Sequence, residues 1–224
     1  MSSTRFLRLT ALALCLGIPA LALAAGNKIT PTLESVQVRH NGQTVTIQRG
    51  HDLNATLPEI YRKTDRGCPP FCVQPMVVVE GVETIGELDV LDYLQRMSQG
   101  DTDILLVDSR TPDWVMRGTI PGSVNIPWNR ISRDKTGTFE TPGEADTFEQ
   151  TLRDQFNVVR DPSTGGWDFT NAKTLVLFCN GIWCPQSTAN IKTLVGIGYP
   201  PDKLKWYRGG MQDWLSVGLT SVQP

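Results

Sequence analysis

A run of five apolar or β-branched residues, followed directly by a cysteine, constrains the fold of this chain more than any other segment. The run covers residues 174–178, Cys179 follows it, and a helix is expected to begin near Ser187 after a short loop. Strand, loop and helix in this order build open parallel sheets, which bind ligands at the carboxyl ends of their strands. The thiol of Cys179 is therefore expected at that edge, under a helix N-terminus that favours a thiolate or a bound anion.

Strand and helix patterns alternate over the C-terminal two thirds of the chain. Strands are expected at 84–85, 104–108, 123–126, 174–178 and 204–207, and helices at 86–98, 111–117, 144–155, 187–195 and 211–217. Such alternation predicts an α/β domain, an open parallel sheet of about five strands flanked by helices. Residues 130–172 form a long charged connection that is expected to contain one of these helices.

A small β-hairpin module is expected before this domain. Residues 33–49 alternate between apolar and polar on either side of Asn41-Gly42, a strong signal for a tight hairpin turn. A polar stretch then leads into residues 67–76, where prolines hold the backbone extended and exclude a helix. This segment is interpreted as a linker or lid, with Cys68 and Cys72 as a candidate disulfide.

The first 24 residues are typical of a secretory signal peptide. Basic residues precede an Ala/Leu-rich run, and Ala22-Leu23-Ala24 forms a small-residue cleavage site before Ala25. A retained membrane anchor is the alternative, but Pro19 and the cleavage site favour removal of the segment. We therefore expect a periplasmic protein without stable membrane insertion after cleavage.

Charge and cysteine usage exclude several classes of function. Loss of two leader arginines from 21 basic residues leaves 19 against 23 acidic residues, a net charge of −4, which argues against nucleic acid as a partner. The four cysteines of the mature chain suggest pairing in an oxidising compartment, with the connectivity left open. Both histidines lie in the N-terminal quarter, and the cysteine spacings are not those of common zinc sites, so no metal and no cofactor are expected.

Several sequence blocks in a fixed order resemble a rhodanese-like domain over residues 82–222. The blocks are Leu-Val-Asp-Ser-Arg at 106–110, Gly-Thr-Ile-Pro-Gly-Ser-Val-Asn-Ile-Pro at 118–127, the Cys179 strand and loop, and Gly-Tyr at 198–199 with Tyr-Arg-Gly-Gly-Met-Gln-Asp-Trp at 207–214. The resemblance implies a sulfurtransferase or persulfide carrier. Its donor would be thiosulfate, a polysulfide or a persulfide, and its acceptor a thiol, which could belong to a protein.

This resemblance divides the chain into three parts and assigns roles to individual residues. The parts are a signal peptide at 1–24, the hairpin and Pro/Cys-rich segment at 25–81, and a rhodanese-like domain at 82–224. Cys179 would be the catalytic nucleophile, because a thiolate attacks sulfane sulfur far better than a thiol. The loop after it would stabilise anions through its backbone N–H groups. We call the residues that form it the cradle residues; they are Asn180, Gly181, Ile182, Trp183, Gln186 and Ser187. Asp108 and Arg110 are expected to brace the site, and Arg208 to form structural ion pairs.

The loop departs from the common family pattern. Counting back from Gly198-Tyr199 places Ser187 at the family's serine and Gln186 where an arginine is usual, and Pro185 removes one N–H from the cradle. Ordinary transfer from thiosulfate to cyanide is therefore not expected, whereas carrying sulfur or sensing redox state remain open.

The remaining cysteines leave alternatives open. Cys184 is either a resolving cysteine for Cys179 or a small hydrophobic residue under the helix. Cys68 and Cys72 form either a plain disulfide or a second pair that exchanges with the loop. Two rival functions follow, a thiol–disulfide redox protein that uses both pairs and a non-catalytic binding module on the same fold.

Overall fold

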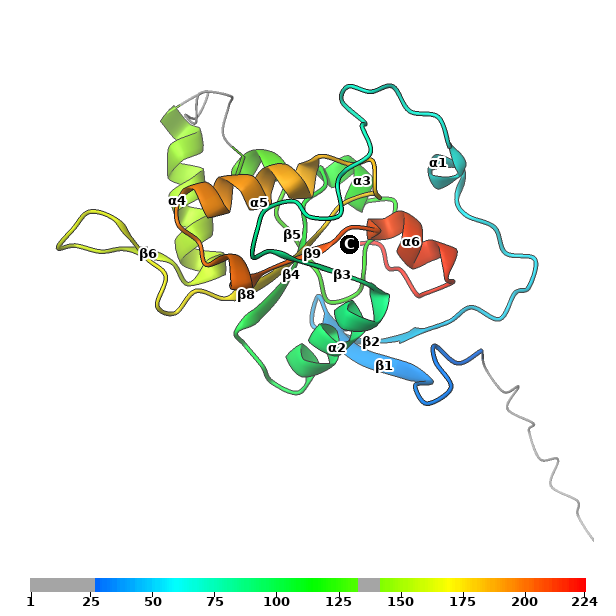
Figure 1. The fold of residues 1–224 in the computed structure, drawn as a ribbon. Helices are drawn as coiled ribbons and strands as arrows, with labels where there is room; N and C mark the ends of the chain where they lie inside the picture. Colours follow the sequence, from blue (N-terminus) through cyan, green and yellow to red (C-terminus); the bar gives the residue numbers. More distant parts are fainter. Residues whose placement is uncertain (1–26, 133–141) are drawn as a thin grey trace, which may run out of the picture.

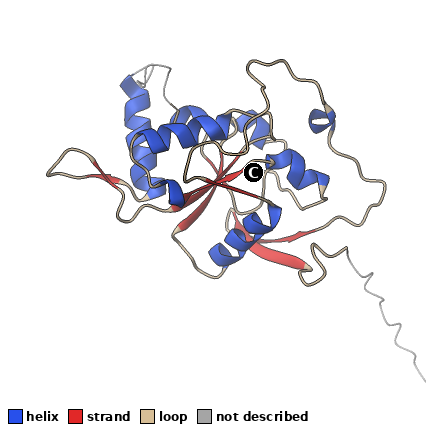
Figure 2. Cartoon of the chain, in the orientation of Figure 1, coloured by secondary structure: helices blue, strands red, loops and turns tan. Residues whose placement is uncertain are grey.

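The computed structural model describes residues 27–132 and 142–224, so the expected signal peptide and its cleavage site lie outside the described residues. At its centre is one sheet of parallel strands (Figures 1 and 2), whose members are β3 (Glu83–Ile85), β4 (Ile104–Asp108), β5 (Val124–Asn125), β8 (Thr174–Phe178) and β9 (Leu204–Tyr207). Their order across the sheet is β3-β9-β8-β4-β5. The predicted α/β class and five-stranded parallel sheet are confirmed.

The two central strands are apolar because both of their faces are covered. All five residues of β4 and four of the five in β8 are buried, as expected for strands inside a parallel sheet. Alternate residues of β8 point into different cores, since Val176 packs in one apolar cluster and Leu177 in the other. Asp108 is paired with Phe178, and Phe178 with Tyr207, so all three strands end at one edge.

Helices cover both faces of the sheet (Figure 1). The longer ones are α2 (Glu87–Ser98), α4 (Pro142–Phe156), α5 (Gln186–Gly196) and α6 (Gly210–Ser216), and the short ones are α1 (Glu59–Arg62), α3 (Pro112–Val115) and the 3-10 turns η1 (Trp128–Arg130) and η2 (Pro201–Lys203). The cluster on one face includes Leu91 of α2 and Trp214 of α6. The cluster on the other includes Leu152 of α4 and Leu194 of α5.

The N-terminal hairpin is confirmed and packs against the domain. Strands β1 (Ser35–His40) and β2 (Gln43–Gln48) pair antiparallel, and the turn residues Asn41 and Gly42 have positive φ angles of 47° and 78°, as a tight hairpin turn requires. Val36, Val38 and Ile47 are buried in the same cluster as α2. The hairpin therefore shares its core with the sheet domain.

The long connection contains more structure than the sequence indicated. Besides α4, it holds a second hairpin, β6 (Val159–Arg160) with β7 (Trp167–Asp168). Strands of two residues are too short to produce a periodic pattern, which is why they were not predicted. No helix in the described part of the chain is both long and apolar enough to cross a membrane.

Candidate active site

Cys179 lies at the carboxyl end of β8, as predicted, and the start of α6 holds its backbone in place. The carbonyl oxygens of Cys179 and Asn180 accept hydrogen bonds from the backbone N–H groups of Met211 (3.0 Å) and Gln212 (2.9 Å). Gly210 makes this approach feasible, because its φ is +56° and a Cβ built there would overlap the Cys179 carbonyl. The Gly-Gly pair at the start of α6 thus positions the cysteine loop.

Cys179 and Cys184 are joined by a disulfide. Their Cα atoms lie 6.1 Å apart, within the usual range for a bridge, and the two residues are 2% and 3% exposed. The backbone N–H of Cys184 donates to the carbonyl of Gly181 at 2.9 Å, which folds the loop back on itself. The structure therefore favours Cys184 as the partner of Cys179 over a small hydrophobic residue under the helix.

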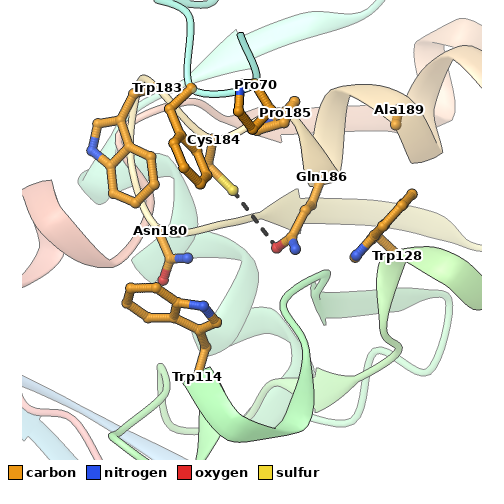
Figure 3. A pocket seen from close by; sticks show the side chains of 10 residues that line it. Pro70, Trp114, Trp128, Asn180, Trp183, Cys184, Pro185, Gln186 and Ala189 are labelled. Carbon is orange, nitrogen blue, oxygen red and sulfur yellow. Dashed lines mark hydrogen bonds between the residues drawn. The ribbon is translucent and has the colours of Figure 1, made fainter. Parts of the chain in front are cut away.

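Gln186 occupies the position where the family pattern usually has an arginine, and it contacts both sulfur atoms. Its Oε1 lies 3.3 Å from Sγ of Cys179 and 3.7 Å from Sγ of Cys184, and Figure 3 shows the second contact. Rotation of the amide would present its NH₂ group to a thiolate instead. The loop thus offers a neutral hydrogen-bonding group where a fixed positive charge is usual.

Three further cradle residues, Ser187, Trp183 and Ile182, each hold a different part of the loop region. Ser187 is buried and accepts a hydrogen bond from the indole N–H of Trp206 at 3.2 Å, which ties α5 to β9. The indole N–H of Trp183 donates to Oε1 of Gln212 at 3.0 Å, and Ile182 and Trp183 pack around the disulfide. These contacts hold the loop against α6 and α5 against β9.

Asp108 and Arg110 form a fully buried ion pair that supports the site. Nε and Nη2 of Arg110 donate to the two carboxylate oxygens of Asp108 at 2.8 and 2.6 Å. Burial alone would lower the pKa of Arg110, but the hydrogen bond and charge of Asp108 outweigh it and the pKa is raised. Thr119 adds a hydroxyl donor to Asp108 at 2.7 Å.

Tyr61, a residue that the sequence analysis missed, connects this pair to the loop. Its hydroxyl accepts from Nη1 of Arg110 at 3.0 Å and donates to Oδ1 of Asn180 at 3.4 Å. Burial raises the pKa of Tyr61, so it stays a hydrogen-bond donor. Its position beside Leu57 and Ile60 in an otherwise polar stretch was the available signal.

Arg208 corrects one expectation, because none of the ion pairs among the described residues includes it. Its Nε and Nη2 donate instead to the backbone carbonyl of Gln74 at 3.3 and 2.8 Å. The Arg208 guanidinium, directly after β9, thus holds a segment from the N-terminal part of the chain, a contact that local sequence patterns do not reveal.

The Pro/Cys-rich segment lies over the cysteine loop, as expected for a lid. The ring of Phe71 meets the ring of Trp183 edge-on with centroids 5.7 Å apart, and the Arg66 guanidinium lies 3.6 Å from that indole ring. Cys68 and Cys72 are joined by a disulfide with Cα atoms 4.6 Å apart. The loop closed by the second cysteine pair therefore contacts the loop closed by the first, through Phe71 and Trp183.

A cavity of about 360 Å³ opens between this lid and the loop (Figure 3). We call it the tryptophan cavity; its lining residues are Pro70, Phe71, Trp114, Trp128, Asn180, Trp183, Cys184, Pro185, Gln186 and Ala189. Aromatic rings and prolines dominate, and the polar side-chain groups are two amides and the indole N–H groups of three tryptophans. Among the residues that the structure describes, no group of three or more His, Cys, Asp or Glu side chains is arranged to hold a metal ion.

Comparison with known proteins gives one family and several solved structures. A Bacillus halodurans protein is 17% identical, with 63% of this chain and 77% of that chain covered and a TM-score of 0.42. The human single-domain sulfurtransferase is 20% identical (60% and 96% covered, TM-score 0.35). A thiosulfate sulfurtransferase from Pseudomonas aeruginosa is 14% identical (TM-score 0.38), and the match covers 63% of this chain but only 20% of that longer protein.

No curated protein matches the sequence. The family described as "Rhodanese-like domain" matches residues 90–217, which is more than half of the chain and contains the whole cysteine loop.

Proposed function

The chain belongs to the family of rhodanese-like domains, and on this basis we propose that it is a sulfurtransferase or persulfide carrier with Cys179 as its nucleophile. The observation that carries the proposal is the position of Cys179, at the carboxyl end of β8 and ahead of the N-terminus of α5. A helix N-terminus lowers the pKa of a nearby thiol and so favours the reactive thiolate.

The proposed reaction starts once a thiol has opened the Cys179–Cys184 disulfide. The Cys179 thiolate attacks the outer sulfur of a persulfide donor, R–S–SH; the donor S–S bond breaks, RS⁻ leaves, and Cys179–S–SH forms. An acceptor thiolate then attacks that outer sulfur, and Cys179 leaves as a thiolate. Each step exchanges one S–S bond for another, so no outside oxidant is consumed.

Gln186 bears on the choice of donor. Thiosulfate is a dianion, and a neutral amide offers it no compensating charge where family members carry an arginine. A persulfide donor, whose sulfur carries at most one negative charge, therefore suits this loop better than thiosulfate does. The acceptor would be a thiol, either small or on a protein.

Mass spectrometry after exposure of the reduced protein to polysulfide tests this proposal. We expect an added mass of about 32 Da, one sulfur atom, on the peptide that contains Cys179. Cys179→Ser should abolish it with little loss of folding, since oxygen is similar in size to sulfur but a far weaker nucleophile at neutral pH. Cys184→Ser is the matched control and should still load. Loading retained in the Cys179→Ser variant would place the chemistry elsewhere, and loading in neither protein would favour a binding module.

The Cys179–Cys184 disulfide favours a second candidate, a thiol–disulfide redox protein. This function requires both cysteines of the loop, whereas sulfur loading requires only Cys179. Assay of disulfide reduction with a small dithiol as electron source separates the two, because Cys184→Ser would abolish redox turnover while leaving sulfur loading intact.

The periplasm is the proposed location, and its basis is the leader at residues 1–24. An oxidising compartment is compatible with two cysteine pairs in the mature chain. On the same basis we propose that residues 25–81 form an N-terminal module and residues 82–224 the sulfur-transferring domain.

A further inference from the structure

The tryptophan cavity has an unusual chemical character for a site that is proposed to handle sulfur anions. Three indole rings, one phenyl ring and two prolines form most of its wall, and none of its lining residues is charged. An ionised ligand buried there would lose hydration without gaining a counter-charge, which is costly. The cavity therefore suits an uncharged ligand with an apolar body.

The size of the cavity indicates a small molecule. Its volume of about 360 Å³ is at the lower end of the range for small-molecule sites. Its walls come from four separate parts of the chain: Pro70 and Phe71 in the lid, Trp114 in α3, Trp128 in η1, and residues 180–189 of the loop and α5.

Cys184 is the sulfur-bearing residue of the cavity wall. Cys179 is not among the described residues that line the cavity, although it is the disulfide partner of Cys184. In the view of Figure 3, the Gln186 side chain lies between Cys184 and Trp128. A ligand in the cavity would therefore meet the Cys184 end of the disulfide, with an amide beside it.

We propose that the tryptophan cavity binds an uncharged organic thiol with an aromatic or aliphatic body and presents its sulfur to Cys184. This deepens, and rests on, the proposed sulfur chemistry of the loop, because it names the class of thiol that opens the disulfide.

The exchange step needs no oxidant or reductant other than the ligand thiol itself. The ligand thiol gives its proton to water, and its sulfur attacks Sγ of Cys184. The Cys184–Cys179 bond breaks, a mixed disulfide forms between the ligand and Cys184, and Cys179 leaves as a thiolate. The leaving group is the nucleophile of the proposed transferase, so binding of the thiol would prime the protein to accept sulfur.

Two thiols that differ by one charge provide the test. Benzyl mercaptan and 4-(mercaptomethyl)benzoate carry the same reacting group, and the second adds a carboxylate at the far end of the ring. With the oxidised full-length protein, and rates corrected for thiolate fraction, we expect benzyl mercaptan to open the disulfide at least about tenfold faster. Peptide mapping after an acid quench should find the mixed disulfide on Cys184 and a free thiol at Cys179.

Trp128→Ala tests the wall of the cavity. Trp128 is 36% exposed, so its truncation should leave the fold intact, and the preference for the neutral thiol should fall by about three- to tenfold. Leu88→Ala, at an exposed position of α2 outside the cavity, is the matched control and should keep the preference.

Benzyl alcohol, which has no sulfur, measures binding without reaction. It should shift the indole N–H resonances of Trp114, Trp128 and Trp183 in NMR spectra of the isotope-labelled protein. Equal rates for the two thiols, a mixed disulfide on Cys179, or indole resonances that do not move would each overturn the proposal. Sulfur loading of the reduced protein is read separately on Cys179, so failure of this inference and failure of the proposed function remain distinguishable.

Discussion

The backbone N–H of Gln74 donates a hydrogen bond to the carbonyl oxygen of Ile182 at 2.8 Å, and this contact joins the lid to the cysteine loop. The same glutamine accepts hydrogen bonds from Arg208, at its carbonyl, and from the Thr188 hydroxyl (3.1 Å), at its side chain. Both disulfides therefore lie within a few residues of one anchoring point. The loop closed by each disulfide is thus held to the other through this one backbone contact.

The redox states of the two pairs are the first prediction. Cys68 and Cys72 should be oxidised in the protein as isolated, because the proposed export would place them in an oxidising compartment. Cys179 should be free or reversibly paired with Cys184. Peptide mapping under non-reducing conditions, with free thiols trapped at acid pH, measures both. Full alkylation of Cys68 and Cys72 would remove the second pair from any exchange mechanism.

The buried ion pair provides the second prediction. Arg110→Ala leaves the carboxylate of Asp108 buried without its partner and should lower the free energy of unfolding by about 3–5 kcal/mol. Tyr61→Phe removes one hydrogen bond from the charged group and should cost about 1.5–3 kcal/mol.

Urea denaturation gives both values. Arg96→Ala is the control, since its ion pair with Asp101 is solvent-exposed and should contribute about 0–1 kcal/mol. If Arg110→Ala cost no more than this control, the buried pair would not brace the site.

The close approach at the start of α6 gives the third prediction. Gly210→Ala forces a Cβ onto the Cys179 carbonyl, so it should both destabilise the protein and slow sulfur loading of Cys179. Gly165→Ala is a matched control, because Gly165 also has a positive φ, 71°, but nothing lies within 4 Å of a Cβ built there. The control should cost only the backbone strain of about 1–2 kcal/mol. Thermal melts and loading assays of both variants make the comparison, and equal effects would contradict it.

A carboxyl group in α6 gives the fourth prediction, which concerns pH. Burial and the nearby charge of Glu87 raise the pKa of Asp213 above its ordinary value of 3.8, with Arg208 partly opposing them. The folded state then holds this proton more tightly than the unfolded state, so the contribution of Asp213 to stability is present at low pH and is lost as pH rises through the raised pKa.

Asp213→Asn removes this dependence. Relative to the wild type, the variant should gain stability as pH increases from 4 to 7, as measured by urea denaturation across that interval. A constant difference between the two proteins would show that the carboxyl group does not titrate abnormally. Asp154→Asn is the control: a hydrogen bond from Arg153 lowers the pKa of Asp154 below its ordinary value of 3.8, so its difference from the wild type should stay constant over this interval and change only at lower pH.

The fifth prediction concerns the N-terminus of the mature protein. Because the small-residue site ends at Ala24, the mature chain should begin at Ala25 or within one residue of it. N-terminal sequencing of the protein from a periplasmic fraction measures this directly. A chain in that fraction that begins at Met1 would refute the signal peptide.

Local patterns were sufficient for the elements that position the proposed nucleophile, Cys179. The apolar run of β8 was predictable because both faces of a central parallel strand are buried, and the Asn41-Gly42 turn because few residue pairs tolerate two successive positive φ angles. Cys179 at the carboxyl end of β8 followed from the same pattern. The family resemblance was likewise carried by short contiguous blocks.

Contacts between distant segments were decided only by the tertiary structure. Tyr61 reaches Asn180 across 119 positions, Arg208 binds the Gln74 carbonyl in place of a carboxylate, and the tryptophan cavity gathers side chains from four segments. Hydrophobic periodicity reports which face of an element is buried, but not which loop will cover it. The course of the Pro/Cys-rich segment over the sheet edge depends on many packing contacts at once. The sequence by itself therefore determined the fold and the place of Cys179 at the end of β8, whereas tertiary packing decided which side chains surround its sulfur.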